Sequence, residues 1–375
     1  MNYSLRLYDE ELLRFSLEQR GIEGLVAEIV SVNEEKRSLL PLDLNVSGEG
    51  MIAWLQRRVI PRNRAYVDEI LASLGLSLND TKGIIDICKG LSLNDSYWVV
   101  PADGTESFAE YNLYENKFSD ILALVAYTGT GNAQNAFRSS PELTTGGMLR
   151  KAWRWMEDGI YLYKGGTEGF ANTGNEPYSE YYASQIAQEM ELNAITYDLT
   201  YWKDILTSTC KLFTDIDTSY IAVGHIITHG GLKAVKEYYE QLGTEFLEQM
   251  ASMLVFDAVI YNEDRHFGNF GVLRDNHTGR ILAPAPLFDN GNSLFHFAMK
   301  DDLQDIAAYA KSRSSAYNVP FETICEEFLG EQQRVQLQRL EGFRFTRHPS
   351  INMDEERLSV IEAFLQERVK QLLAI

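Results

Sequence analysis

The stretch NEDRHFGN at residues 262–269, followed by FDNG at residues 288–291, is the part of the sequence that is most informative about fold and chemistry. Asp264 is placed to orient a hydroxyl nucleophile and to accept its proton. Asn269 and Asp289 carry hard oxygen ligands of the kind that Mg²⁺ prefers when it is held against phosphates. Either motif alone is common in turns, but an Asp, an Asn and a second Asp before a Gly, in this order, point to phosphoryl transfer.

The residues between the two motifs predict a β-hairpin. Apolar runs at 270–273 and 281–283 flank the turn signal Asp-Asn-His-Thr-Gly at 275–279. A hairpin of this kind returns the chain to its starting point. We therefore expect Asn269 and Asp289 to lie close together, and we predict an ATP-dependent phosphotransferase.

Lys164 follows aromatic residues in an expected strand at 160–165. A lysine in this setting is expected to pair with a carboxylate or with the α- and β-phosphate oxygens, although an edge-strand lysine that points to water fits the local pattern as well. A helix expected from about 177 to 190 follows. Glu180 in its first full turn is the preferred partner of Lys164, and Glu176 and Glu189 are the competitors.

The pair Gly146-Gly147 opens the hairpin that ends in Lys164. Without Cβ atoms, backbone N–H groups can approach phosphate closely. The hydroxyl residues just ahead of the pair stand where a phosphate could disturb nucleotide binding, or they are plain polar loop residues: Ser139, Ser140, Thr144 and Thr145.

The remaining polar residues of the first motif are expected to shape the catalytic loop. Arg265 and His266 are predicted to structure it, His266 by hydrogen bonding to backbone or to Asp289, with direct catalysis by His266 as the alternative. Asn262 is expected to brace the loop or simply to end the preceding helix. A zinc site at His225 and His229 is disfavoured, since no Glu and no third ligand accompany them.

The order of expected elements predicts an α+β chain with a two-lobed, protein-kinase-like arrangement. Strand, strand, helix, strand, strand over 121–215 is the order of a β-rich N-lobe, and 216–375 is mostly helical, with helices at 244–260 and 353–373. Residues 1–120 show mostly short helical patterns and no legible catalytic chemistry. We expect an additional, mostly helical N-terminal domain there.

Bulk properties describe an ordinary globular protein. The chain has 375 residues, 45% of them apolar and 23% charged. No signal-peptide pattern and no apolar run of about 18 residues is legible, and three separated cysteines form neither a disulfide framework nor a zinc spacing. A cytoplasmic protein without a membrane partner is the expectation.

The net charge of −20 disfavours direct nucleic-acid binding, because an acidic surface repels phosphate backbones. One local exception is a cluster of four arginines at Arg57, Arg58, Arg62 and Arg64. Intramolecular pairing or a solvated helix end is the simpler interpretation, and an acidic or phosphorylated partner is the alternative.

This constellation resembles the HipA-like and CtkA-like bacterial serine/threonine kinases over roughly residues 140–345. The resemblance rests on Gly146-Gly147 with Lys151, on Lys164, on the start of the following helix at 176–180, and on the motifs at 262–269 and 289–291. It implies a divergent protein-kinase fold, ATP and Mg²⁺ as cofactors, phosphorylation of a protein substrate, and autophosphorylation near the glycine loop.

By the same resemblance, the residues that bind the nucleotide are Gly146, Gly147, Lys151, Lys164, Glu180 and His266. Some relatives are toxins neutralised by an antitoxin, which makes an antitoxin or regulator protein a possible partner. Residues 1–120 do not obviously match the small N-terminal subdomain of the toxin kinases, and this departure weakens the toxin–antitoxin expectation more than the chemistry.

Two other functions stay open. Asp-Arg-His-x-x-Asn followed by Asp-x-Gly also resembles the phosphatidylinositol kinases, but the acidic chain lacks a basic amphipathic helix for an anionic membrane. A pseudokinase that binds nucleotide as an interaction module is the non-enzymatic alternative. It is disfavoured because each expected catalytic group has a candidate residue.

Overall fold

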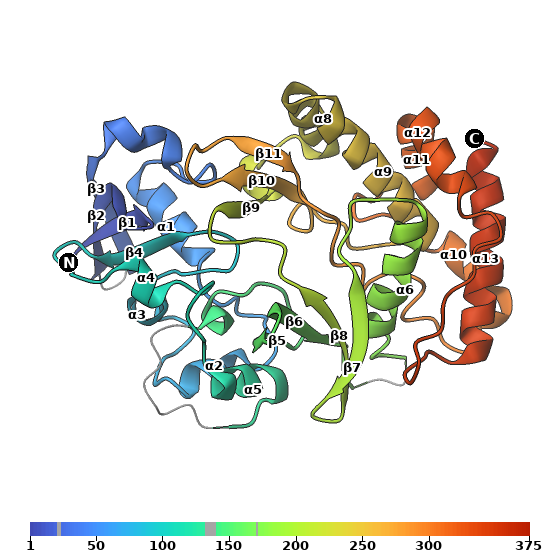
Figure 1. The fold of residues 1–375 in the computed structure, drawn as a ribbon, viewed down its shortest axis with the longest axis horizontal. Helices are drawn as coiled ribbons and strands as arrows, with labels where there is room; N and C mark the ends of the chain where they lie inside the picture. Colours follow the sequence, from blue (N-terminus) through green and yellow to red (C-terminus); the bar gives the residue numbers. More distant parts are fainter. Residues whose placement is uncertain (21–23, 132–139, 170–171) are drawn as a thin grey trace. The chain divides into compact units, whose positions relative to one another are not determined.

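The computed structural model describes residues 1–20, 24–131, 140–169 and 172–375, which form an α+β fold with several antiparallel sheets (Figure 1). The chain divides into two compact units. The first comprises Met1–Tyr163, Leu212–Ile221 and Leu273–Leu282, and the second comprises Lys164–Lys211, Ala222–Val272 and Ala283–Ile375. Each unit is described by itself below.

The first unit contains an antiparallel sheet of four strands in the order β3-β2-β1-β4. Its strands are β1 (Asn2–Leu7), β2 (Glu10–Arg20), β3 (Gly24–Val32) and β4 (Tyr97–Pro101). Leu5 of β1 lies opposite Leu13 of β2 on one side and opposite Val99 of β4 on the other. The expectation of a mostly helical N-terminal region is therefore wrong for residues 2–20 and 24–32, which form strands apart from the turn at 8–9. In β2, buried Leu13, Phe15 and Leu17 alternate with the less buried Arg14, Ser16 and Glu18, which is the two-residue period of a strand.

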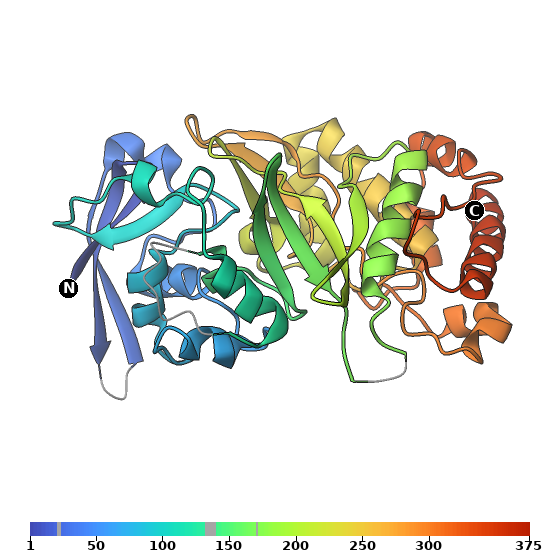
Figure 2. The ribbon, with the colours of Figure 1, turned by 60° about the horizontal axis from the view of Figure 1, so that its bottom comes forward.

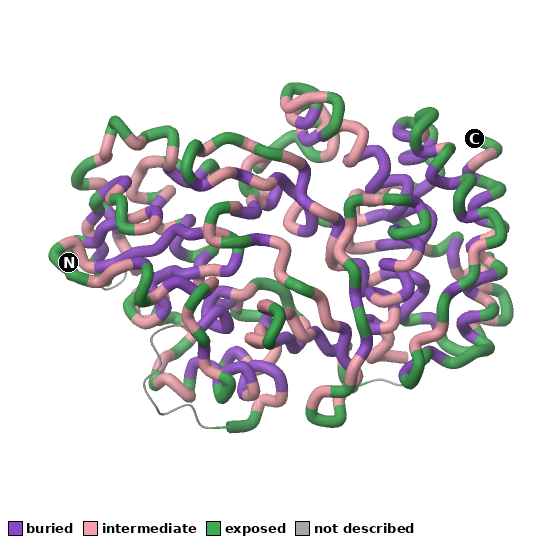
Figure 3. Tube along the Cα trace, in the orientation of Figure 1, coloured by how far each residue is buried: buried purple, intermediate pink, exposed green. Residues whose placement is uncertain are grey.

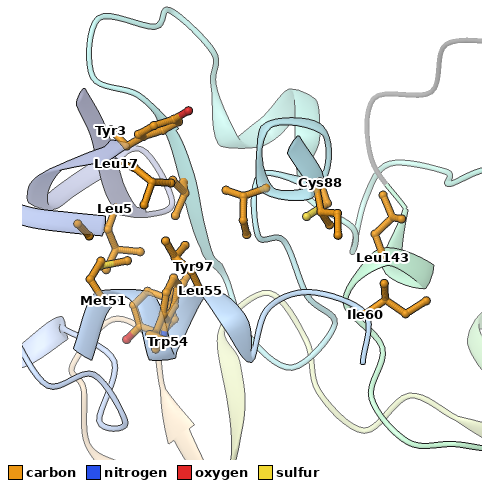
Figure 4. Close-up of a cluster of buried hydrophobic side chains, with 14 of the residues drawn as sticks. Tyr3, Leu5, Leu17, Met51, Trp54, Leu55, Ile60, Cys88, Tyr97 and Leu143 are labelled. Atoms are coloured by element: carbon orange, nitrogen blue, oxygen red, sulfur yellow. The ribbon is translucent and has the colours of Figure 1, made fainter. Parts of the chain in front are cut away.

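One face of this sheet is covered by helices, and together they enclose the core of the first unit. Figure 4 shows Leu5 and Leu17 from the sheet close to Met51 and Trp54 of α1 (Gly48–Gln56). Ser47 begins α1 as its N-cap, since its hydroxyl accepts a hydrogen bond from the backbone N–H of Gly50. The other helical segments of the unit are η2 (Glu34–Leu39), α2 (Val67–Ala72), α3 (Thr81–Cys88), α4 (Phe108–Tyr111), α5 (Asp120–Thr128) and η3 (Pro141–Leu143).

The strand, strand, helix, strand, strand order expected for residues 121–215 is present. It consists of β5 (Lys151–Met156), β6 (Gly159–Gly165), α6 (Glu176–Glu189), β7 (Tyr197–Trp202) and β8 (Ile205–Lys211). The four strands form a sheet in the order β5-β6-β8-β7, and the boundary between the two compact units falls inside β6, between Tyr163 and Lys164. A further sheet has the order β11-β10-β9 and contains β9 (Thr218–Ala222), β10 (Gly271–Asp275) and β11 (Ile281–Pro284).

In the second unit, helix α6 packs against the hairpin of β7 and β8, as the two views in Figures 1 and 2 also show. The hairpin is antiparallel, with Tyr197 opposite Cys210 and Trp202 opposite Ile205. Pro177 stands in the first turn of α6, where its missing N–H has no intrahelical partner to lose. This packing places the side chains of α6 beside the strands that follow Lys164.

Helix α9 (Thr244–Ile260) is the central helix of the second unit, and it covers the residues expected to be helical. Every residue from Met250 to Ile260 is buried, because α8 (Gly231–Leu242), α11 (Phe321–Phe328), α12 (Glu331–Gln338) and α13 (Glu355–Leu373) pack around it (Figure 3). A helix that is buried on all sides is apolar all round, which explains why residues 250–260 are apolar apart from Ser252 and Asp257. The remaining helices of this unit are α7 (Val223–Ile226), η4 (Asp302–Asp305) and α10 (Ile306–Lys311).

Within the described part of the chain, no helix is both long and apolar enough to cross a membrane. The three cysteines are free thiols, and Cys88 and Cys325 are buried. The two compact units do not follow the ranges 1–120, 121–215 and 216–375 expected from the sequence, and the division into an accessory domain and two lobes remains a prediction.

Candidate active site

The candidate catalytic loop begins where α9 ends. Tyr261 adopts the left-handed conformation (φ 54°) and turns the chain out of the helix. Asn262 braces this exit: its Nδ2 donates to Asp257 Oδ1 (3.0 Å), and its Oδ1 accepts from the backbone N–H of Asp264 (3.1 Å). The end of a rigid, buried helix thus sets the position of Asp264.

Arg265 ties the catalytic loop to the chain around Asp289. Its guanidinium is buried, with 1% of the residue exposed, and Nε donates to Asp257 Oδ2 at 3.0 Å. Nη1 donates to the backbone oxygens of Asn269 (3.2 Å) and Phe288 (2.5 Å), so one donor binds the backbone of one expected metal ligand and of the residue before the other. Burial alone would lower the pKa of Arg265, but the Asp257 carboxylate outweighs it and keeps the guanidinium charged.

Asp264 and Asn269 are held in one turn. The side-chain Nδ2 of Asn269 donates to the backbone oxygen of Asp264 at 3.0 Å, which leaves Oδ1 as the atom of Asn269 available to a metal ion. The side chain of Asp264 is half-buried, and Asn292 Nδ2 donates to its Oδ2 at 2.7 Å. The turn therefore presents one carboxylate and one amide oxygen from neighbouring positions.

The hairpin expected between the two motifs is present in β10 and β11. Asp275 N–H donates to the backbone oxygen of Arg280 near the turn, and Ala285 N–H donates to that of Gly271 at the base. Asp289 follows with φ 58°, the left-handed conformation that Asp tolerates better than most residues. Its backbone N–H donates to Tyr197 Oη at 3.1 Å, which ties this position to β7.

Lys164 lies between two carboxylates. Its Nζ donates to Glu180 Oε1 at 2.7 Å and is in contact with Asp289 Oδ1. Lys164 and Glu180 are buried, whereas the side chain of Asp289 is about a third exposed. Burial by itself would lower the pKa of the Lys164 ammonium, but Asp289 and Glu180 raise it above its ordinary value, so the group stays charged.

Of the three candidate partners on α6, Glu180 is the one in contact with Lys164. Its second oxygen, Oε2, accepts from the backbone N–H of Asn290 at 2.7 Å. Glu176 instead accepts a hydrogen bond from the backbone N–H of Thr167, and Glu189 is exposed. One carboxylate of α6 thereby binds both the strand lysine and the loop that contains Asp289.

The backbone of Gly291 lies close to α6 and to Lys164. A Cβ at this position would stand 3.4 Å from Glu180 Oε1 and 3.7 Å from Lys164 Nζ. The loop therefore passes close to the ion pair of Lys164 and Glu180. The tightest contact of such a Cβ would be with Glu176 Cβ at 3.3 Å, whereas its distances to Glu180 and Lys164 are those of ordinary van der Waals contacts.

His266 is exposed on the catalytic loop. Its backbone N–H donates to the oxygen of Asp264 (2.8 Å), and its ring Nδ1 accepts from the N–H of Gly268 (3.0 Å). Because Nδ1 is the acceptor, the proton of the neutral ring is on Nε2. Of the two hydrogen-bonding arrangements expected for His266, the structure contains the one with the backbone.

Gly146, Gly147 and Lys151 belong to the first unit. Gly147 has φ +85°, and a Cβ there would meet Lys151 Nζ at 2.2 Å. Lys151 Nζ donates to the backbone oxygen of Gly146 at 2.9 Å. Lys151 Nζ is the end of a flexible side chain that could move aside, so the left-handed φ of residue 147 is the feature that favours glycine there.

The hydroxyl residues before the glycine pair are differently placed. Ser140 and Thr144 are buried, Thr145 is half-buried, and Ser139 lies outside the described residues. Thr144 Oγ1 donates to the backbone oxygen of Leu91 at 2.8 Å. Phosphorylation of Ser140 or Thr144 would require this segment to open.

The four arginines of the first unit pair within the chain. Arg57 binds Asp43, Arg58 binds Asp95 through both terminal nitrogens, Arg62 binds Asn79, and Arg64 binds Glu142. The Arg64–Glu142 pair is fully buried, and burial raises the pKa of Glu142 to about 7 against the opposing effect of Arg64. Intramolecular pairing, the simpler of the two interpretations, accounts for the cluster.

The sequence did not reveal four residues that hold this site together: Asp257, Tyr197, Asn290 and Asn292. Asp257 lies in an apolar helical stripe, where a buried carboxylate requires a partner, and Arg265 eight residues later is that partner. Tyr197 has no comparable signal, because its partner Asp289 is ninety-two residues away.

The residues present fit a magnesium ion. Asn269 Oδ1 and the Asp289 carboxylate are hard oxygen donors from adjoining loops, and Mg²⁺ is usually bound by one or two such groups plus phosphates and water. In the ranges that the structure describes, no group of three or more His, Cys, Asp or Glu side chains is placed to hold a metal ion such as zinc.

Comparison with solved structures shows which known fold this chain resembles. No protein-family model and no curated protein matches the chain. HipA of Shewanella oneidensis MR-1, solved in a toxin–antitoxin complex with HipB and operator DNA, superposes with a TM-score of 0.55 at 12% identity, over 100% of this chain and 99% of that one. The chain has a HipA-like fold. The Helicobacter pylori proinflammatory kinase CtkA is also similar, with a TM-score of 0.47 at 18% identity over 61% of this chain and 90% of that one.

Proposed function

We propose that this HipA-like protein is an ATP- and Mg²⁺-dependent kinase that phosphorylates serine or threonine hydroxyls of a protein substrate. The observation that supports it most directly is the contact of Lys164 with both Glu180 and Asp289. A buried, charged lysine held by a helix carboxylate and by a metal-ligand candidate is what phosphate binding and phosphoryl transfer need.

Each residue of the site has a role in this proposal. Lys164 binds phosphate oxygens of ATP, and Glu180 holds the lysine in place. Asn269 and Asp289 hold Mg²⁺, which neutralises charge on the phosphates when bound. Asp264 orients the substrate hydroxyl and accepts its proton.

Further parts of the proposal rest on the family resemblance. Gly146, Gly147 and Lys151 approach the phosphates, and His266 shapes the loop that meets the nucleotide. Autophosphorylation before the glycine pair, at a hydroxyl such as Thr145, belongs to the same proposal. Since the Shewanella HipA structure contains HipB and operator DNA, a protein regulator is a partner worth seeking for this chain too.

The test incubates the purified protein with Mg²⁺ and radiolabelled ATP, with the chain itself, casein and phosphatidylinositol vesicles as acceptors. The variants are Asp264→Asn and Asp289→Asn, and Asp204→Asn is the matched control because Asp204 is exposed in the turn between β7 and β8. We expect a loss of about 10²- to 10⁴-fold for Asp264→Asn and no change for the control.

The acceptor that takes the label decides between the functions. Label on protein, lost in Asp264→Asn, supports the proposal, and mass spectrometry then locates the phosphosite. Label on lipid alone establishes a lipid kinase. Magnesium-dependent ATP binding without transfer to any acceptor indicates a pseudokinase, and no nucleotide binding at all refutes the kinase proposal.

A further inference from the structure

Asn292 lies three residues after Asp289, outside both sequence motifs, and it contacts the candidate catalytic loop twice. Its side-chain Nδ2 donates to Asp264 Oδ2 at 2.7 Å. Its backbone oxygen accepts from the N–H of Glu263 at 3.1 Å. One residue thus binds the side chain of Asp264 and the backbone immediately before it.

The two bonds make a fixed frame because the segment around Asn292 is itself anchored. The backbone N–H of Leu294 donates to the oxygen of Ile260 at 2.8 Å, at the end of α9. Ser293 Oγ donates to the oxygen of Asn290 at 2.6 Å, and the oxygen of Ser293 accepts from Ser179 Oγ of α6. Asn292 is therefore held from both sides.

The backbone and the side chain of Asp264 are controlled by different residues. The backbone N–H binds Asn262, and the backbone oxygen accepts from His266 and Asn269. None of these bonds sets the rotation of the carboxylate. Among the described residues, Asn292 is the one that donates a hydrogen bond to the Asp264 carboxylate.

We infer that Asn292 is a positioning residue for phosphoryl transfer. By binding Oδ2, it orients the Asp264 carboxylate so that Oδ1 receives the substrate hydroxyl. An amide N–H suits this task, because it donates to a carboxylate without adding a charge that would compete with the incoming phosphates. The inference rests on the proposed kinase function.

Asn292 also links the candidate metal site to the candidate base, Asp264. Asp289, a metal-ligand candidate, and Asn292, the partner of the base, belong to one short segment. When that segment is in place, the metal ligand and the orientation of Asp264 are set together. A shift of the segment removes both at once.

The test compares Asn292→Ala, Asn292→Ser and Asn292→Asp with the wild type, and Asn193→Ala is the control at an exposed asparagine of the same unit. We expect Asn292→Ala to lower kcat about 10- to 100-fold, since a misplaced base loses much of its contribution while the nucleotide still binds. KM for ATP and the affinity for Mg·ATP should stay within about twofold of the wild type. Asn292→Ser keeps a shorter donor and should fall in between.

Asn292→Asp supplies a readout that a merely structural role would not change. At neutral pH the new carboxylate repels Asp264, and kcat should fall below that of Asn292→Ala. When pH is lowered towards about 5, two carboxyls at hydrogen-bond distance share a proton, and the ratio of the two variants should rise in favour of Asn292→Asp. In an Asp264→Asn background, Asn292→Ala should change the residual rate by less than about twofold, because both substitutions remove the same function.

Three results would overturn the inference while kinase activity stands. These are a kcat of Asn292→Ala within twofold of the wild type, a loss confined to Mg·ATP affinity, and full additivity with Asp264→Asn. A wild-type protein that binds Mg·ATP and transfers no phosphate overturns the proposed function, and the role of Asn292 with it. The two failures are therefore distinguishable.

Discussion

Asp257→Asn removes one charge from a buried ion pair and should destabilise the second unit strongly. Asp257 and Arg265 are 3% and 1% exposed. The guanidinium makes three contacts of 3.0–3.3 Å with the two carboxylate oxygens, and Asn262 adds a fourth at 3.0 Å. The substitution keeps the shape and leaves the Arg265 charge buried beside a neutral amide.

The magnitude follows from the burial and the geometry. Two unit charges about 4 Å apart attract by about 4 kcal/mol at an effective dielectric constant of 20. Removing one partner of a buried pair costs about 3–5 kcal/mol, because the other charge stays uncompensated. Since the amide of Asn retains one acceptor oxygen, we expect a loss of about 3 kcal/mol in the free energy of unfolding.

The matched control is Glu237→Gln, which removes one charge from the exposed pair of Lys233 and Glu237 in the same unit. Their side chains are 85% and 57% exposed, and the atoms are 3.9 Å apart. A pair of this kind contributes about 0.5 kcal/mol or less. The contrast between the two variants isolates burial as the cause.

The assay is urea unfolding followed by far-ultraviolet circular dichroism, with hydrogen exchange of peptides from α9 and the loop at 262–269. Tryptophan fluorescence is a poor probe here, because Trp202 is the only one of the five tryptophans in the second unit. Protection of the loop amides should fall in Asp257→Asn together with global stability. A loss below about 1 kcal/mol, equal to that of Glu237→Gln, would refute the reasoning that this pair holds the catalytic loop.

Two further predictions concern other contacts of the second unit. Tyr197→Phe removes the acceptor of the part-buried Asp289 N–H, and losing such a hydrogen bond costs about 1 kcal/mol. Magnesium-dependent nucleotide affinity should therefore fall several-fold, whereas the exposed Tyr201→Phe should change nothing, and equal affinities would contradict this. Burial, opposed by Glu176, lowers the pKa of His296 to about 4, below the 6.5 of the unfolded chain, so stability is lost as pH falls from 6.5 towards 4. Between pH 7 and 5 the wild type should lose about 2 kcal/mol more than His296→Gln in urea unfolding, and parallel pH profiles would exclude this role of His296.

Elements with a strong local signal were predictable from the sequence. The helix at 244–260 and the hairpin after Asn269 follow from apolar spacing and from a turn made of Asp, Asn, Thr and Gly. The strands at 2–20 also had a local signal, the alternation of Tyr3, Leu5 and Leu7, which is the two-residue period of a half-buried strand. That alternation was missed among the short helical patterns of the N-terminal region.

Contacts within the site were predictable only where the sequence pattern indicated both of the residues in contact. Lys164 and Glu180 emerged because a strand lysine is expected to meet a carboxylate on the next helix, but the choice of Glu180 over Glu176 depends on tertiary packing. The contact of Lys164 with Asp289 spans 125 residues, and no local pattern encodes it. The same holds for Asn292, whose role depends on how two loops meet.

Arg265 has no proposed role in the chemistry, and its presence in the first motif is explained by the hydrogen bonds that it donates. Its nitrogens reach the Asp257 carboxylate, the backbone oxygens of Asn269 and Phe288, and the side-chain oxygen of Asn290. A lysine has one nitrogen with three donors and no planar fork, and it could not span these acceptors from one buried position. The two metal-ligand candidates belong to different loops. The charged, planar guanidinium of Arg265 lies between these loops and binds the backbone of both. Arg265, beside Asp264, is thus the part of the motif that joins the two loops, and the candidate metal ligands depend on it for their distance from one another.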